Sequence, residues 1–87
     1  MKDDPLTILA RYLVPTRDPE VAAAMRIADG VVRGGEPPAA DWHAFEHRRA
    51  RVVHLIAGQI QMPTDSDSSL VYGALAELRA MVCGSAT

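Results

Sequence analysis

Three histidines are the residues of this 87-residue chain whose type and spacing could do chemistry. On a helix, which turns about 100° per residue, His43, His47 and His54 fall within an arc of about 40°. Histidine changes charge near neutral pH and is the commonest metal ligand. The simplest interpretation is a solvated polar face. The alternatives are a site for Zn²⁺ or another transition metal, and a pH-sensitive interface.

The spacing limits what a metal site here can hold. His43 and His47 are one helical turn apart and can share an ion, whereas His54 lies about 10 Å further along the axis and needs a second ion or a second chain. Residues 43–47 read His-Ala-Phe-Glu-His, which resembles the H-x-x-E-H zinc string of inverzincin metallopeptidases. That resemblance implies Glu46 as the base. Because it covers five residues and so short a chain cannot build a substrate cleft, we expect no peptidase.

An arginine run adjoins the histidines and suggests a further alternative, a nucleic-acid-binding regulator. It consists of Arg48, Arg49 and Arg51. The formal net charge of −2 and the lack of an identifiable recognition helix argue against nucleic acid. Arg49 points toward the apolar side of the helix, where we expect it to pair across a helix or a partner interface.

Proline, glycine and capping residues divide the chain into four predicted helices, over about 5–13, 19–33, 39–61 and 67–83. The clearest start is Asp18-Pro19-Glu20, a cap followed by a first-turn proline and an acid, and the clearest stop is Gly34-Gly35. No segment shows strand alternation. The sequence therefore predicts a single all-α domain over 1–87, a small bundle of about four helices with one long central helix over about 39–61 that carries the histidines.

The apolar residues of the last two predicted helices form either the core or a partner interface, and the pattern does not separate the two. They are Trp42, Phe45, Val52, Ile56 and Ile60, with Arg49 beside them, and Leu70, Leu75, Leu78 and Met81. A chain of this size buries only about 60–65% of its unfolded surface. Because a long helix would protrude from so small a bundle, we expect a homodimer.

Composition narrows the class of protein. The single cysteine, Cys83, excludes an internal disulfide, and the chain shows neither a signal-peptide pattern nor an apolar run long enough for a membrane span. We therefore expect a cytoplasmic protein. With no nucleophile–base pair, phosphate loop, paired carboxylates or cofactor motif, the sequence favours a non-enzymatic interaction or regulatory protein that binds another protein through helix–helix contacts, as an adaptor, accessory subunit or inhibitor.

Overall fold

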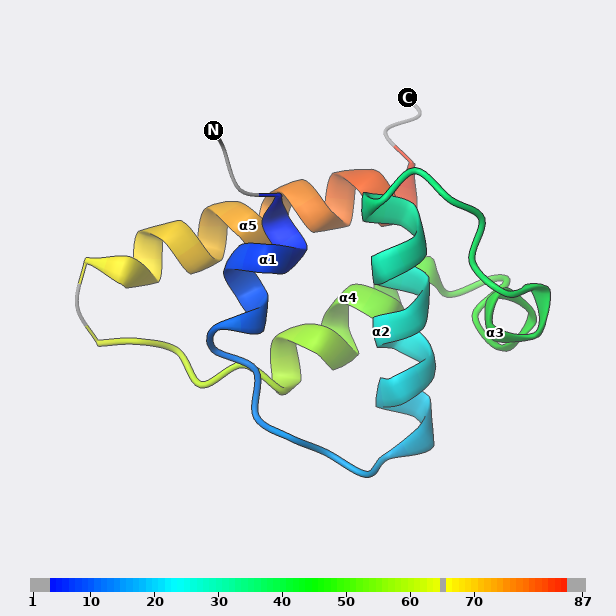
Figure 1. Cartoon of the computed structure of the whole chain (residues 1–87), viewed down its shortest axis with the longest axis horizontal. Coiled ribbons are helices and arrows are strands. Elements are labelled where there is room, and N and C mark those ends of the chain that lie inside the picture. The colour runs from blue at the N-terminus through cyan, green and yellow to red at the C-terminus, as the bar shows by residue number, and fades with distance from the viewer. Residues whose placement is uncertain (1–3, 65, 85–87) are drawn as a thin grey trace.

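The protein is all-α, as predicted. The computed structural model describes residues 4–64 and 66–84 and contains five helices (Figure 1). They are α1 (Pro5–Ala10), α2 (Pro19–Val32), α3 (Ala39–Ala44), α4 (Arg49–Gly58) and α5 (Asp67–Cys83). Helix α5 packs on α1, α4 and α2, whereas α3 lies against α2 alone among the described helices. None of these helices is both long enough and apolar enough to cross a membrane.

Helix α2 begins and ends where its sequence signals indicate. The Asp18 side chain accepts a hydrogen bond of 2.9 Å from the Glu20 backbone N–H, which satisfies one of the free donors of the first turn. At the other end Gly34 adopts φ +76°, and the Gly35 N–H donates to the Gly30 carbonyl at 2.8 Å. This is the Schellman arrangement, which satisfies a carbonyl of the last turn and favours glycine at the left-handed position.

Two of the predicted helices end earlier than expected, because the residues predicted as their last turns form a short antiparallel β-bridge with each other. Helix α1 stops at Ala10 rather than near residue 13, and Leu13 forms an isolated antiparallel bridge with Ile60. Within it, the Gln61 N–H donates to the Tyr12 carbonyl at 2.9 Å. Prolines follow both segments and disfavour helix in the residue before them, so the chain is extended there.

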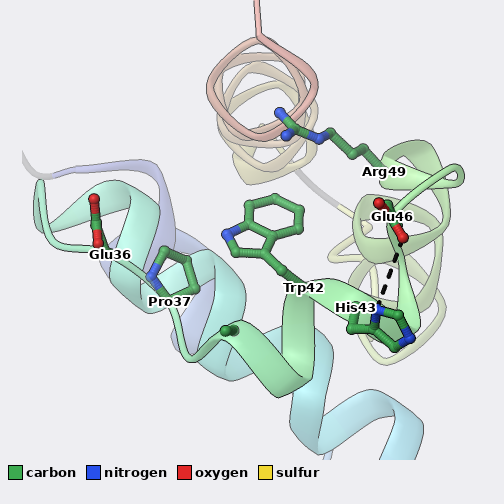
Figure 2. A pocket seen from close by; sticks show the side chains of 7 residues that line it. Glu36, Pro37, Trp42, His43, Glu46 and Arg49 are labelled. Atoms are coloured by element: carbon green, nitrogen blue, oxygen red, sulfur yellow. Dashed lines mark ion pairs between the residues drawn. The ribbon is translucent and has the colours of Figure 1, made fainter.

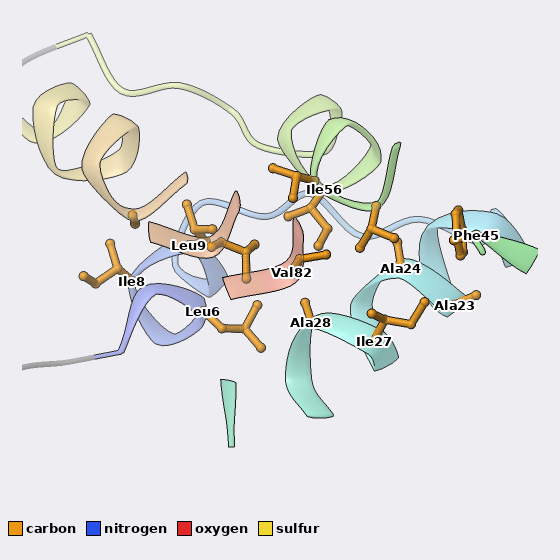
Figure 3. Packing of buried hydrophobic residues seen from close by; sticks show 14 of the residues in the cluster. Leu6, Ile8, Leu9, Ala23, Ala24, Ile27, Ala28, Phe45, Ile56 and Val82 are labelled. Carbon is orange, nitrogen blue, oxygen red and sulfur yellow. The ribbon is translucent and has the colours of Figure 1, made fainter. Parts of the chain in front are cut away.

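The core gathers side chains from every helix except α3 (Figure 3). Its largest fully buried members are Phe45, Leu9, Ile27, Ile56, Leu78, Val52, Val53, Val71 and Val82. The sequence predicted ten residues for the core or a partner interface, and the structure shows which of them are buried. Four of the ten residues, Phe45, Val52, Ile56 and Leu78, are core; Trp42, Ile60 and Leu75 are half-buried; and Arg49, Leu70 and Met81 are exposed.

The structure corrects the single long helix predicted over 39–61. The segment forms two helices, α3 and α4, that are separated by a turn over residues 45–48, and residues 59–61 lie beyond the end of α4. In the turn, the Phe45 N–H donates to the Trp42 carbonyl at 3.0 Å and the Arg48 N–H to the Phe45 carbonyl at 2.8 Å. These are i→i−3 bonds, tighter than those of an α-helix, so the chain changes direction at Phe45.

Two physical reasons account for this break. Residues 46–51 contain no large apolar side chain, so a helical turn there would bury nothing against the core. The turn also brings two distant groups into contact. In a continuous helix Trp42 and Arg49 would be about 10 Å apart along the axis, whereas here the Arg49 guanidinium lies over the indole.

Candidate functional site

Trp42 is the centre of an open pocket of about 480 Å³ (Figure 2). Three successive segments line it: the loop after α2, helix α3, and the turn that leads into α4. The lining residues are Glu36, Pro37, Ala39, Trp42, His43, Glu46 and Arg49. The guanidinium carbon of Arg49 is 4.6 Å from the centre of the indole, which is a cation–π contact. Two of the residues predicted for a partner interface, Trp42 and Arg49, thus meet in one site.

An ion pair with α2 holds the pocket in place. Arg26 of α2 donates two hydrogen bonds, of 2.9 and 3.0 Å, to the carboxylate of Asp41, the residue before Trp42. This bidentate geometry fixes α3 against α2. The hydrogen bonds from Arg26 also lower the pKa of Asp41 below its ordinary value of 3.8, so the carboxyl is charged at neutral pH.

A close backbone approach sets the opposite wall of the pocket. A Cβ atom on Gly30 would lie 3.1 Å from the backbone nitrogen and from Cγ of Pro37, closer than ordinary van der Waals contact. Glycine at this position in α2 therefore lets the loop fold back over the end of the helix. Pro37 and Glu36 are placed beside Trp42 as a result.

The pocket places an aromatic ring and a guanidinium beside an imidazole and two carboxylates. Its lining contains no serine, threonine, cysteine or lysine to act as a nucleophile. His43 Nδ1 lies 3.7 Å from the Glu46 carboxylate, which becomes an ion pair only when the imidazole is protonated. Tryptophan and arginine are among the residue types that contribute most to binding at protein interfaces; here Trp42 is half-buried and Arg49 is exposed.

The break at residues 45–48 also divides the predicted histidine stripe. His43 faces the Trp42 pocket, while His47 and His54 line a different pocket with Arg48, Arg51 and Arg79. The two histidines expected to share a metal ion, His43 and His47, therefore belong to different sites. In residues 4–64 and 66–84, no three histidine, cysteine, aspartate or glutamate side chains come together in a group that could hold a metal ion.

A second exposed surface lies on α5. The exposed large apolar side chains of the described residues are Val14, Leu70, Tyr72 and Met81, and three of these four are on α5. Between them runs a face of small exposed residues, Ser69, Gly73, Ala76 and Ala80, which we call the outer face of α5. Leu70 and Met81 flank it on one side and Tyr72 on the other, by their positions around the helix.

No protein-family model, curated protein or solved structure matches this chain, so the site is interpreted from its own geometry. Two residues of the Trp42 pocket and one exposed apolar residue of α5 were not singled out in the sequence. Glu36 and Pro37 join Trp42 through the fold of a loop, for which the only local signal is Gly30. Tyr72 had a clear signal, because its position on a helical wheel is about 100° from the centre of the apolar face of α5.

Proposed function

We propose that this protein is a non-enzymatic interaction or regulatory protein of the cytoplasm that works as a homodimer joined through the outer face of α5. The observation that carries the proposal is the concentration of exposed apolar side chains on that one helix, at Leu70, Tyr72 and Met81, with exposed fractions of 44%, 62% and 40%. Small residues between them would let a second backbone approach closely. A face of this kind, left in water, is typical of an interaction surface.

The flanking residues favour a second, antiparallel copy as the occupant. Leu70 and Met81 are equally far from the midpoint between Leu75 and Ala76. A two-fold axis at that midpoint would place Leu70 against the partner's Met81 and Tyr72 against the partner's Arg79. The first pair is apolar with apolar, and the second brings a cation to an aromatic ring. A single two-fold axis therefore gives favourable contacts between the two copies on both sides of the outer face.

The homodimer would carry two Trp42 pockets, and we propose that these bind a larger protein. The pocket is lined by the loop after α2, by α3, and by the turn into the first residue of α4, and no residue of α5 lines it. Self-association therefore leaves it open. Such a dimer would act as an adaptor, an accessory subunit or an inhibitor, in which two identical pockets raise the effective affinity for a partner with two binding elements.

Sedimentation velocity tests the homodimer with one substitution and a matched control. We expect the chain of 9.4 kDa to sediment at twice that mass. Ala76→Arg places a long charged side chain in the centre of the outer face and should give a monomer with unchanged helix content. Ala22→Arg makes the same change at an exposed alanine of α2 and should remain dimeric. A wild-type mass that stays monomeric at every concentration would refute the proposal.

A charge exchange tests the antiparallel arrangement. Leu70→Lys and Met81→Glu, made singly, should each weaken the dimer, since each puts a charge opposite an apolar residue. Together they should restore it, because each lysine would then face a glutamate of the other copy. Within one helix the two positions are about 16 Å apart, too far for an internal pair. If the double variant dissociates further than either single variant, the antiparallel register is wrong.

A further inference from the structure

A second pocket, of about 530 Å³, is lined by arginine and histidine side chains and by no carboxylate. It lies where the start of α4 faces α5, and its lining residues are His47, Arg48, Ala50, Arg51, His54 and Arg79. The chain as a whole is slightly acidic, with 11 acidic and 9 basic residues. Three arginines around one concavity are therefore a local excess of positive charge that the rest of the composition does not predict.

The arginines here differ from most others in the described part of the chain. Arg26 and Arg33 pair with Asp41 and Asp29, and Arg49 lies on the Trp42 ring. By contrast, the side chains of Arg48 and Arg79 form no hydrogen bond or close ion pair with any described residue, although the charge of Arg48 adds to that of Arg51 in lowering the pKa of Glu20. Arg51 bonds Glu20 through Nε and one terminal nitrogen, at 2.6 and 3.2 Å, which leaves its other terminal nitrogen to donate. Arginine donors that converge on one concavity in this way favour an anionic ligand.

The start of α4 also favours an anionic ligand in this pocket. Its N-cap, Arg48, makes no side-chain cap, and its first turn contains no acidic residue, in contrast to the Asp18 cap and Glu20 at the start of α2. The N-terminus of a helix carries partial positive charge and free N–H groups, so cationic side chains beside it are unfavourable unless an anion joins them. The charge and the free donors of this turn therefore favour the same kind of ligand.

We propose that this pocket binds a small phosphate-bearing ligand, through Arg48, Arg51 and Arg79 with the first turn of α4. Phosphate suits the pocket because arginine recognises its tetrahedral oxygens with paired hydrogen bonds. A small ligand suits it better than a nucleic acid, because the cations are confined to one concavity and Glu20 lies at its edge. The phosphate group can belong to a free anion or to a phosphorylated metabolite. Arg48, Arg51 and the first turn of α4 take no part in the proposed homodimer, whereas Arg79 would also face the partner's Tyr72 in it.

NMR titration of the ¹⁵N-labelled chain tests the site. Inorganic phosphate, pyrophosphate and a nucleoside triphosphate are added separately at constant ionic strength and pH. We expect saturable shifts in the amides of residues 48–51, with pyrophosphate or the triphosphate tighter than phosphate because more oxygens reach the arginines. If phosphate alone equals the others, the ligand is a free anion; if the triphosphate is much tighter, it is a phosphorylated metabolite. Both outcomes support the site.

Two substitutions of equal charge separate site binding from general attraction. Arg48→Ser should weaken binding by about tenfold or more, the effect of losing one charge-assisted hydrogen bond. Arg17→Ser removes the same charge at an exposed arginine outside the pocket and should leave binding unchanged. Circular dichroism checks that both variants fold. The proposal fails if no shift saturates, if both variants lose affinity equally, or if a single-stranded oligonucleotide binds far more tightly than any small phosphate.

Discussion

Phe45 is the residue on which the change of direction between α3 and α4 depends. It belongs to neither helix, yet only 2% of it is exposed, and Figure 3 shows it at one edge of the core cluster. We expect Phe45→Ala to lower the free energy of unfolding by about 3–5 kcal/mol, because it removes an aromatic ring and leaves a cavity. That is a large part of the stability of so small a chain.

Phe45→Leu is the matched control for that prediction, since it keeps an apolar side chain and should cost less than about 1.5 kcal/mol. Urea unfolding followed by circular dichroism measures both variants. If both variants lower the free energy of unfolding by the same small amount, the Phe45 side chain does not anchor the turn.

Arg49 and Trp42 offer a direct optical test of the pocket, because Trp42 is the only tryptophan of the chain. Arg49→Ala uncovers one face of the indole and should shift its emission to the red and increase quenching by acrylamide. The lost contact should cost about 0.5–1 kcal/mol of stability. Arg49→Lys keeps the charge but not the flat guanidinium, so its emission and quenching should lie between those of the wild type and of Arg49→Ala. Identical quenching in all three proteins would show that the contact does not form in solution.

At the scale of elements, Gly30 controls how the loop after α2 meets the Trp42 pocket. Alanine in a helix is ordinarily more stable than glycine by up to about 1 kcal/mol. At Gly30 the added methyl group would meet backbone atoms of Pro37 at 3.1–3.2 Å, so the loop must move. We therefore expect Gly30→Ala to destabilise the protein by about 1–3 kcal/mol and to alter Trp42 fluorescence.

Gly58→Ala is the control for this element, since a Cβ there has no neighbour within 4 Å. It should leave Trp42 fluorescence unchanged and slightly stabilise α4. Thermal unfolding of the two variants, together with emission spectra, decides the matter. A stabilised Gly30→Ala variant with a normal spectrum would show that the loop is not held against α2.

The sequence predicted helix boundaries correctly where capping residues determine them. It predicted them wrongly where tertiary packing determines them. Helix α5 spans the predicted 67–83, and the Asp18 cap and Gly34 stop of α2 were read from single residues. The break at 45–48 was missed because Phe45, Val52 and Ile56 would also share one face of an unbroken helix. Periodicity alone cannot show that Phe45 enters the core from a turn.

The candidate sites divide in the same way. Trp42 and Arg49 were predicted from residue type, and their partnership follows from the turn. Arg79 joins His47 and His54 only because α5 packs across α4, a contact between residues far apart in the sequence. Nothing in the local sequence around Arg79 indicates this neighbour.

At the scale of the whole molecule, α2 is tied to both halves of the divided segment by ion pairs. Arg26 of α2 holds Asp41 of α3, and Glu20 of α2 accepts from Arg51 of α4. In each pair the arginine's hydrogen bonds lower the pKa of the carboxyl group, from 3.8 for Asp41 and from 4.5 for Glu20. A carboxyl group with a lowered pKa in the folded state contributes stability above its unfolded pKa and loses it as the pH falls through the folded value.

These shifts predict the order of events in acid. As the pH falls below 3.8 and through the lowered pKa of Asp41 in the folded state, the pair between Arg26 and Asp41 should be lost. Helix α3 should then leave α2 before the core unfolds, since α3 has no buried residue of its own. Trp42 fluorescence should therefore change at a higher pH than the far-ultraviolet circular dichroism. Asp41→Asn removes the pair at every pH, so its emission at neutral pH should already resemble that of the acidified wild type.

A comparison of the wild type with Asp41→Asn at several pH values shows whether the charged Asp41 carboxylate stabilises the fold. The difference in urea midpoint between wild type and Asp41→Asn should be present at neutral pH and should vanish well below pH 3.8, where the wild-type carboxyl group is also neutral. Asp29→Asn breaks a pair confined to α2, between Asp29 and Arg33, and should leave Trp42 fluorescence unchanged. If instead the two optical signals change together in acid, α3 unfolds with the core, and the ion pair is not what holds the pocket to α2.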